Sequence, residues 1–414
     1  MIVSIYHLSN ASFHALRRYA GAVLALFVSL LTVCACVPDN STAQQPGSAA
    51  SRIEWIDVHV HLLGGGGPRG ADYPGAVRAA IAAMDEAGIK KSVVLPPPQV
   101  SGGRLPFDWK DFREALQAWP GRFAFLGGGG LLNPMLQDAG RENTVDEATR
   151  RRFADAAKEI RAAGAVGFGE IAAHHLSFMG GHPYESVPAD HPLFLLLADI
   201  AARYDVVIDL HFDLVTEDMP LPPRLSSPSN PPKLQANIAG FERLLAHNRQ
   251  AKIVWAHAGS DPLGNWTASL SRDMLRKHPN LSMSLRLRGG MMPGGGPPPG
   301  MQPPGLIPGR PRPGPARPGG MMQESMSPSM AFSPAGEINP EWLKLLREFP
   351  DRFVIGGDQF IASPQLQGVG PGLTFAAIAP VIRERTRQFL VSLPPDVARK
   401  VAYENAMRLY KLPE

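Results

Sequence analysis

Short apolar runs, many of them β-branched, alternate with longer segments of helical pattern from residue 53 to the carboxyl end of the chain. The short runs predict eight strands, at residues 53–58, 92–95, 123–126, 165–171, 206–210, 252–256, 281–287 and 353–355. The longer segments predict helices at residues 74–87, 109–118, 145–163, 192–204, 234–248, 266–277, 341–349, 375–392 and 395–412. This alternation predicts parallel strands joined by crossover helices.

Alternation alone fits two α/β folds, an open doubly wound sheet and a closed (β/α)8 barrel of the TIM type. The number of strand-like runs, eight, and the length of the chain, 414 residues, favour the barrel. We therefore predict one barrel over residues 53–412, with its site at the face where the strands end. The last helix, residues 395–412, is expected to pack on the outside.

Two segments depart from the alternation. Residues 219–232 are rich in proline and serine and predict a loop after the fifth strand. Residues 289–333 are more unusual, because 289–320 alone contain 11 glycines and 11 prolines in 32 residues. That composition predicts a disordered insertion after the seventh strand. A tolerated surface insertion is the first interpretation; a substrate lid or a partner-binding arm is the alternative.

The amino end resembles an export signal. Arg17 and Arg18 precede an apolar run at residues 20–35, and no acidic residue occurs before Asp39. The run is shorter than the ~20 residues that span a membrane, which favours a cleaved signal over residues 1–36. Residues 33–36 resemble a bacterial lipobox with Cys36 as the lipidated residue, the alternatives being an ordinary cleaved signal or an uncleaved anchor. Residues 37–52 are then a flexible tether.

These features predict a protein that is periplasmic or lipid-anchored to the bacterial envelope, with membrane contact only through its amino end. The two cysteines, Cys34 and Cys36, both lie there, so the barrel has no disulfide framework. The formal net charge is +4, but the signal arginines and the insertion account for all of it. A barrel with no basic excess argues against a nucleic-acid partner and leaves a small-molecule substrate. The oligomeric state stays open.

Polar side chains follow several of the predicted strands. His59 and His61 are two positions apart, so they point to the same side of their strand. The other strand-end residues are Glu170 with His174 and His175 just beyond it, His211, His257 and Asp358. A histidine or aspartate at one strand end is usually structural, but their joint placement at the carboxyl ends of five strands predicts one shared site. Imidazoles and carboxylates are ligands for zinc and similar divalent cations.

Together these motifs resemble the amidohydrolase superfamily, in its amidohydrolase-related branch. The resemblance covers residues 53–412 apart from the insertion, and the closing helix includes Tyr403–Tyr410. The residues that carry it are His59-x-His61, Gly169-Glu170-Ile171, Asp209-Leu210-His211, Trp255-Ala256-His257 and Gly357-Asp358. The motifs are specific to the superfamily and say little about the substrate.

The resemblance implies a divalent metal, commonly zinc, as one or two ions. The implied ligands are His59, His61, His211 and Asp358, with Glu170 joining them if it reaches the metal. Neutral imidazoles with one carboxylate leave the cation net positive, so that it lowers the pKa of a bound water. The implied catalytic residues are Asp358, which accepts the proton of that water, and His257, which binds or polarises the substrate oxygen.

Residues for substrate binding are less defined. Arg286 and Arg288 follow the seventh strand with a spacing of two, so they share a side. If that side is the mouth of the barrel, Arg288 suits an anionic substrate; if it faces the helices, both are surface residues. His174 is a further candidate to orient the substrate, with a plain loop residue as the alternative.

The predicted function is a metal-dependent hydrolase that cuts an amide, ester or lactone bond. A metal-dependent non-oxidative decarboxylase of the same branch is the first alternative. An exported binding protein on an inactive barrel is the second, and the intact set of ligand types argues against it.

Overall fold

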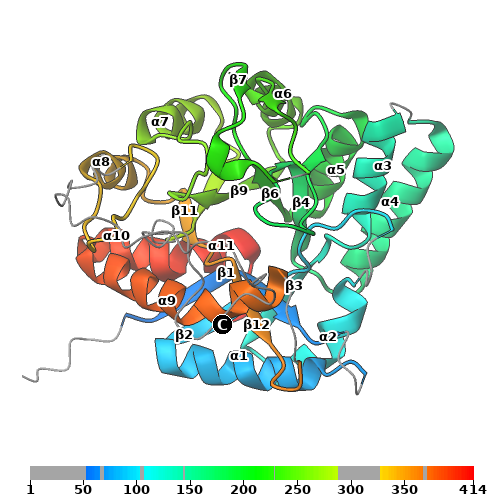
Figure 1. Cartoon of the computed structure of the whole chain (residues 1–414). Coiled ribbons are helices and arrows are strands. Elements are labelled where there is room, and N and C mark those ends of the chain that lie inside the picture. Colours follow the sequence, from blue (N-terminus) through cyan, green and yellow to red (C-terminus); the bar gives the residue numbers. More distant parts are fainter. Residues whose placement is uncertain are drawn as a thin grey trace, which may run out of the picture. The chain divides into compact units, whose positions relative to one another are not determined.

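The computed structural model describes residues 53–65, 70–102, 107–142, 145–227, 229–287, 327–366 and 371–414 (Figure 1). The predicted signal at 1–36, the tether at 37–52, the candidate Arg288 and most of the predicted insertion lie outside the described residues. Residues 51–414 form one compact unit. The architecture below is that of this unit.

Eight parallel strands close into a barrel, which confirms the predicted (β/α)8 fold (Figure 1). Along the barrel wall these strands are β1 (Trp55–Leu63), β2 (Ile89–Val94), β3 (Phe123–Gly128), β4 (Gly167–His175), β6 (Val207–Phe212), β9 (Lys252–Ala258), β10 (Leu281–Leu285) and β11 (Phe353–Ile355). Pairing of β11 with β1, at Asp57 and Ile355, completes the ring. β1 runs past the predicted end at residue 58, so His59 and His61 lie within the strand.

Helices cover the outside of the barrel. They are α1 (Tyr73–Ala87), α2 (Trp109–Gln117), α3 (Leu132–Glu142), α4 (Glu147–Ala162), α5 (Pro192–Tyr204), α6 (Ile238–His247), α7 (Ala268–Lys277), α8 (Pro340–Glu348) and α9 (Pro371–Ser392). Side chains of Asp72, Asp108, Asp146, Thr267 and Asn339 cap the amino ends of five of them. In the described part of the chain, no helix combines the length and apolarity needed to cross a membrane.

The pattern of the sequence did not predict α3. Its first turn contains Pro134 and its last turn Gly140, and both residues indicate a loop when they are considered locally. Proline is tolerated in the first turn of a helix, where its missing N–H has no partner to lose. Gly140 is packed so closely that a Cβ there would lie 2.6 Å from Val187. Tertiary packing therefore decided this helix.

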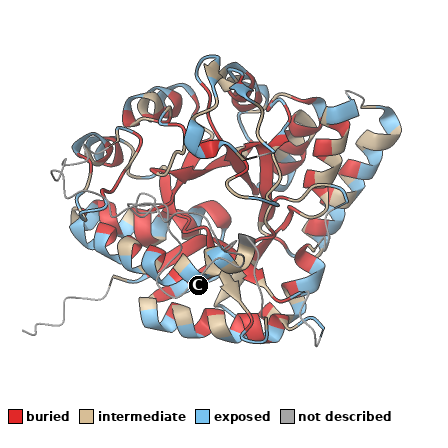
Figure 2. Cartoon of the chain, viewed as in Figure 1, coloured by how far each residue is buried: buried red, intermediate tan, exposed pale blue. Residues whose placement is uncertain are grey.

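Two hydrophobic clusters form the core of the barrel, and a third, smaller one includes Leu225 and Leu263. The largest lies between the strands and the outer helices and contains the fully buried Trp55, Phe168 and Trp255. Figure 2 shows buried residues along the strands and on the helix faces turned toward them. The second joins side chains of β1, β2, β3, β6, β9 and β11 and therefore fills the barrel. Leu409 and Tyr410 of α11 (Asn405–Tyr410) belong to this second cluster, and Asn405 donates to the carbonyl oxygen of Phe353, 2.8 Å away at the start of β11. The last helix, reached through α10 (Pro395–Arg399) and a π-helical turn (Lys400–Glu404), closes the amino end of the barrel.

The eighth strand is broken in the middle. β11 pairs with the first half of β1, and β12 (Gln359–Ala362) pairs with its second half, from Val60 to Leu63. Gly356, Gly357 and Asp358 lie between the two pieces, and Asp358 has a left-handed φ of 49°. A Cβ on Gly357 would lie 2.6 Å from the Asp57 carboxylate, so only glycine fits there. As in a β-bulge, this interruption redirects the side chain that follows.

Two further segments bear on the predicted loops. The loop at residues 219–232 carries a 3-10 turn (Pro223–Leu225), and β7 (Met219–Pro220) pairs with β8 (Lys233–Leu234) at its two ends. The predicted insertion at 289–333 is too long at its carboxyl end, because residues 327–333 pack onto the barrel. Ala331 and Phe332 are buried in the core, and Met330 bridges to Ser260. Apolar side chains resume there, which gives the segment surface to bury.

Candidate metal centre

His59 and His61 are held by their Nδ1 atoms. His59 Nδ1 donates to Asp209 Oδ2 at 3.3 Å, and His61 Nδ1 donates to the carbonyl oxygen of Leu95 at 2.9 Å. Because these partners only accept, the proton of each neutral ring resides on Nδ1 and the lone pair on Nε2. Both Nε2 atoms are buried and make no hydrogen bond to the described residues. In its neutral form, each ring therefore presents the Nε2 lone pair to the space between them.

Glu170 and Asp358 face these two nitrogens. Glu170 Oε2 lies 3.3 Å from His59 Nε2 and 3.4 Å from His61 Nε2. Asp358 Oδ1 lies 3.2 Å from His61 Nε2 and 4.0 Å from His59 Nε2. Four side chains from β1, β4 and the break in the eighth strand thus converge on one point. His59, His61 and Asp358 offer ligand atoms within 4.8 Å of one another, which is a spacing that can hold a metal ion.

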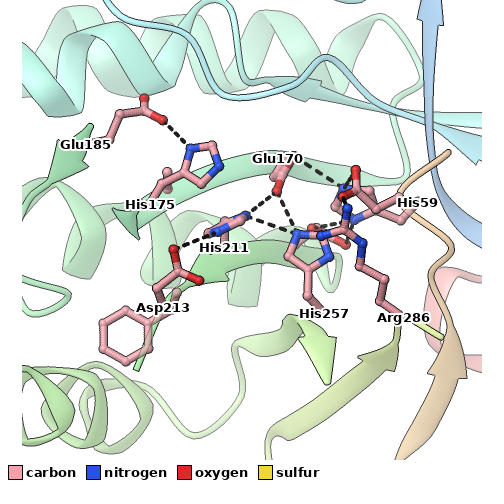
Figure 3. Close-up of polar contacts among 12 residues, drawn as sticks. His59, Glu170, His175, Glu185, His211, Asp213, His257 and Arg286 are labelled. Atoms are coloured by element: carbon pink, nitrogen blue, oxygen red, sulfur yellow. Dashed lines mark hydrogen bonds and ion pairs between the residues drawn. The ribbon is translucent and has the colours of Figure 1, made fainter. Parts of the chain in front are cut away.

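His211 and His257 approach Glu170 from its other side (Figure 3). Glu170 Oε1 lies 2.7 Å from His211 Nδ1 and 3.1 Å from His257 Nε2. The two ring nitrogens are themselves 3.0 Å apart, so both cannot carry a proton in the same neutral arrangement. His59, Glu170 and His257 form a second group able to hold an ion. Glu170 lies between the two groups, in the place of a bridging ligand.

Charge explains the protonation of this cluster. Burial alone would raise the pKa of Glu170, but His59, His211 and His257 outweigh it and hold that pKa well below its usual range. Burial would lower the pKa of His59, yet Asp209 and Glu170 raise it well above 6.5. Asp213 and Glu170 likewise overcome burial and raise the pKa of His211 to about 10. Without a cation, the protonated histidines therefore balance the charge of the ionised carboxylates. A bound cation would replace the protons on these histidines.

The donor set fits a divalent metal ion. The free lone pairs on His59 and His61 and the mixture of imidazole and carboxylate match zinc and cations of similar preference. His59, His61, Asp358 and Glu170 would hold one ion, and His211 and His257 with Glu170 would hold a second. The structure brings all the sequence-predicted ligands together. It places His257 among the candidate ligands as well as beside the substrate space.

Carboxylates behind the histidines were not predicted as site residues. Asp209 orients His59, and Asp213 lies 3.5 Å from His211 Nε2 and accepts the N–H of Leu176 at 2.8 Å. The histidines around Asp213 outweigh its burial and lower its pKa. Their spacing was a usable signal, because Asp209, His211 and Asp213 occupy every second position from β6 onward.

Arg286 lies at the mouth of the barrel and does not face the outer helices. Its Nη2 is 2.6 Å from Asp358 Oδ2, and the side chain is 8% exposed. Burial would raise the pKa of Asp358, but Arg286 and the neighbouring histidines outweigh it and lower that pKa. The Arg286 Nε atom is buried and has no hydrogen-bond partner among the described residues. The guanidinium therefore keeps a donor for another ligand.

The structure separates His174 from His175. His174 Nδ1 donates to the carbonyl oxygen of Asp213 at 2.6 Å, and the ring lines a different cavity, so it is not brought to the cluster. His175 faces the cluster, with its ring centroid 4.0 Å from that of His211. Its Nδ1 lies 2.9 Å from Glu185 Oε2, and Glu185 Oε1 accepts a bond from Asn133 at 2.6 Å (Figure 3). This chain orients His175.

A cavity of about 220 Å³, here called the metal-facing cavity, opens onto the cluster. Its lining includes His61, Glu170, His175, His182, Arg286 and Asp358. Burial lowers the pKa of His182 to about 3. Three other histidines lie away from this cavity: His191 caps α5, and His247 pairs with Asp199 on the surface. His278 ends α7 and is buried rather than exposed.

Comparisons with known proteins agree with this fold. The sequence matches the family model described as Amidohydrolase over residues 56–412. Among solved structures, it is similar to a protein described as amidohydrolase II, with 11% identity, 86% of this chain and 100% of the other covered, and a TM-score of 0.44. Amidohydrolase 2 from Bifidobacterium longum subsp. infantis gives 11% identity, 87% and 100% coverage and a TM-score of 0.37. An amidohydrolase from Mycobacterium avium subsp. paratuberculosis K-10 gives 13% identity, with 81% of this chain and 74% of the other covered and a TM-score of 0.34. A search of curated proteins finds no significant match.

Proposed function

The chain belongs to the amidohydrolase family, whose model it matches over residues 56–412, and we propose that it is a metal-dependent hydrolase of amide, ester or lactone bonds. The observation that carries the proposal is that the buried Nε2 atoms of His59 and His61 have no hydrogen-bond partner among the described residues and face Glu170 and Asp358. Free lone pairs buried beside carboxylates are costly unless a cation joins them. We propose zinc as that cation, because imidazole nitrogen and carboxylate oxygen are among its preferred ligands.

When bound, the metal would lower the pKa of a water molecule and polarise the substrate carbonyl. Asp358 takes up the proton of the attacking water at Oδ1, because Arg286 holds its Oδ2 at 2.6 Å. Arg286 Nε has no hydrogen-bond partner among the described residues, and this donor would stabilise negative charge that develops on the carbonyl oxygen. His257 Nε2 is 3.1 Å from Glu170 Oε1. From this position, His257 would also bind the carbonyl oxygen of the substrate.

His175 serves the leaving group. His175 Nδ1 donates to Glu185 Oε2 at 2.9 Å, so Nε2 of this ring is left for a ligand in the metal-facing cavity, which His175 lines. Asn133 in turn fixes Glu185 at 2.6 Å, and both are buried. A ring that is oriented in this way can hold the departing amine or alcohol by a hydrogen bond.

The experiment combines metal analysis with hydrolysis. Purified protein grown with zinc and manganese is assayed for bound metal and tested on a panel of amides, esters and lactones. We expect bound zinc and turnover in the wild type, loss of both in His59→Ala, and retention of both in the control His247→Ala. A wild-type protein without metal, or a His59→Ala variant with full metal content and turnover, would contradict the proposal.

One observation supports a second reaction, non-oxidative decarboxylation. Arg286 is a buried cation at the cavity, and a guanidinium binds a substrate carboxylate well. Release of carbon dioxide from aromatic carboxylic acids, with no turnover of the ester and lactone panel, would favour this lyase reaction over hydrolysis.

We also propose that the protein is exported and acts outside the cytoplasm. Arg17, Arg18 and the apolar run at residues 20–35 support this, and Cys36 is the proposed site of lipidation. Fractionation of cells that express the full chain tests the location. A membrane-bound wild type and a soluble periplasmic Cys36→Ser variant are the expected results; recovery of both proteins in the cytoplasm would contradict export.

A further inference from the structure

A second cavity adjoins the metal-facing cavity. It has a volume of about 330 Å³ and is here called the apolar cavity. Four residues line both cavities, and they are Phe178, His211, His257 and Arg286. Because His211 and His257 belong to the candidate metal centre, a ligand that reaches the centre can extend directly into the apolar cavity.

The wall of the apolar cavity presents carbon rather than polar atoms. Leu225, Trp266 and Phe212 are buried side chains of this wall, and Met330 lines the same cavity. Trp266 stacks on Trp255 with ring centroids 3.6 Å apart and an interplanar angle of 9°. Its Nε1 donates to Ser271 Oγ at 2.9 Å, so the indole offers only its carbon atoms to the cavity.

Two charged residues of this wall, Arg224 and Asp261, are already bonded to protein groups. The Asp261 carboxylate accepts the N–H groups of Leu263 and Trp266, at 2.9 and 2.7 Å. Arg224 donates to the carbonyl oxygen of Pro262 at 2.5 Å. Since these ion-bearing groups spend their hydrogen bonds within the wall, the cavity suits an apolar ligand group.

Arg286 defines the junction between the two cavities. It is 7% exposed, its Nη2 contacts Asp358, and its Nε has no hydrogen-bond partner in the described part of the chain. A carbonyl oxygen bound at this junction would place one side of the carbonyl toward each cavity. The side toward His175 is the leaving group, so the acyl side extends into the apolar cavity.

We propose that the apolar cavity is the subsite for the acyl part of the substrate, and that this part is a medium-length alkyl chain or an aromatic ring. The proposal rests on the hydrolase function proposed above and adds the class of substrate. The volume agrees with this size, because cavities for small organic ligands begin at about 300 Å³. Compounds with a short polar acyl group would leave this cavity unfilled and are expected to bind more weakly.

The test uses linear alkyl hydroxamates, from acetohydroxamate to decanohydroxamate, as probes on the zinc-loaded full chain. The hydroxamate head binds the metal, while the alkyl chain reports on the subsite. Isothermal titration calorimetry should show affinity rising roughly three- to fourfold for each added methylene until the cavity is full, and then levelling off.

Leu225→Trp and Met330→Trp each place a large side chain in the lining of the apolar cavity. Both variants should lose the dependence on chain length and keep wild-type zinc content and affinity for acetohydroxamate. Val391→Trp is the control, because Val391 is exposed on α9 and does not line the cavity. Circular dichroism and thermal melting check that each variant is folded. Two filling variants are used so that the test remains decisive if one of them does not fold.

The outcomes separate this inference from the proposed function. If acetohydroxamate binds and chain length has no effect in the wild type, the subsite is contradicted while the metal-dependent function stands. The same holds if both filling variants keep the full dependence on chain length. If the protein holds no zinc and binds no hydroxamate, the hydrolase proposal fails, and the subsite proposal fails with it.

Discussion

Asp57 Oδ1 accepts the backbone N–H of Gly357 at 2.9 Å and so joins the first strand to the break in the eighth, 300 positions away. The same oxygen accepts the N–H of His59 at 3.1 Å. Gln359 donates to the other Asp57 oxygen and accepts a bond from Arg383 of α9 at 3.0 Å. One buried carboxylate therefore controls the backbone on both sides of the candidate metal centre, beside His59 and beside Asp358.

Replacing Asp57 should damage both the fold and the metal site. Asp57→Ala leaves the N–H groups of His59 and Gly357 buried without an acceptor, which we expect to cost about 2–4 kcal/mol. Chemical denaturation measures the free energy of unfolding, and elemental analysis should show reduced metal content. Asp155→Ala, on the exposed face of α4, is the control and should change stability by less than about 0.5 kcal/mol. Equal stability and metal content in both variants would contradict the role of Asp57.

Metal affinity should depend steeply on pH. In the metal-free site, carboxylates overcome the effect of burial and raise the pKa values of His59, His61 and His211, the last to about 10. Groups with raised pKa values keep their protons at neutral pH, so a cation must displace them and binding releases protons. Affinity should therefore rise as the pH rises from 6.5 toward the raised pKa values and fall in acid. Calorimetry in buffers of different ionisation enthalpy counts the protons released; a count of zero at neutral pH would contradict these shifts.

Arg286 should matter for turnover more than for metal binding. Arg286→Met removes the partner of Asp358 and the donor at the junction, and we expect kcat/KM to fall by about 10²–10³ with metal content retained. Arg286→Lys keeps the positive charge but lacks the planar guanidinium. Its kcat/KM should lie between those of the wild type and Arg286→Met. Arg276→Met on the surface of α7 is the matched control and should retain wild-type turnover. Wild-type kcat/KM in Arg286→Met would remove this residue from the mechanism.

The hydrogen bonds that link Asn133, Glu185 and His175 lead to a separate prediction. Glu185→Gln weakens the bond that orients His175, so turnover should fall on the order of tenfold. The metal content should not change, because His175 is not among the candidate ligands. Glu147→Gln, in the exposed first turn of α4, is the control. If Glu185→Gln lost metal rather than turnover, these hydrogen bonds would support the metal centre and not the leaving group.

Local pattern was enough for the barrel and for much of the site. The alternation of strand and helix, the spacing of His59 and His61, and the strand-end positions of Glu170, His211, His257 and Asp358 are all properties of neighbouring residues. In a parallel barrel every strand ends at the same face, so residues that are located one strand at a time still meet. This is why side chains that lie together in the structure could be predicted to share one site without knowing any distance.

Only the tertiary structure decided the contacts between strands. The bond of Asp57 to Gly357, the pairing of Arg286 with Asp358, the choice of His175 over His174 and the junction of the two cavities each join segments that are distant in sequence. Residue spacing fixes the side of a strand to which a side chain points, and breaks such as the one at Gly356–Asp358 reset that side. The orientation of the site therefore depends on how the strands pack, which no local pattern contains.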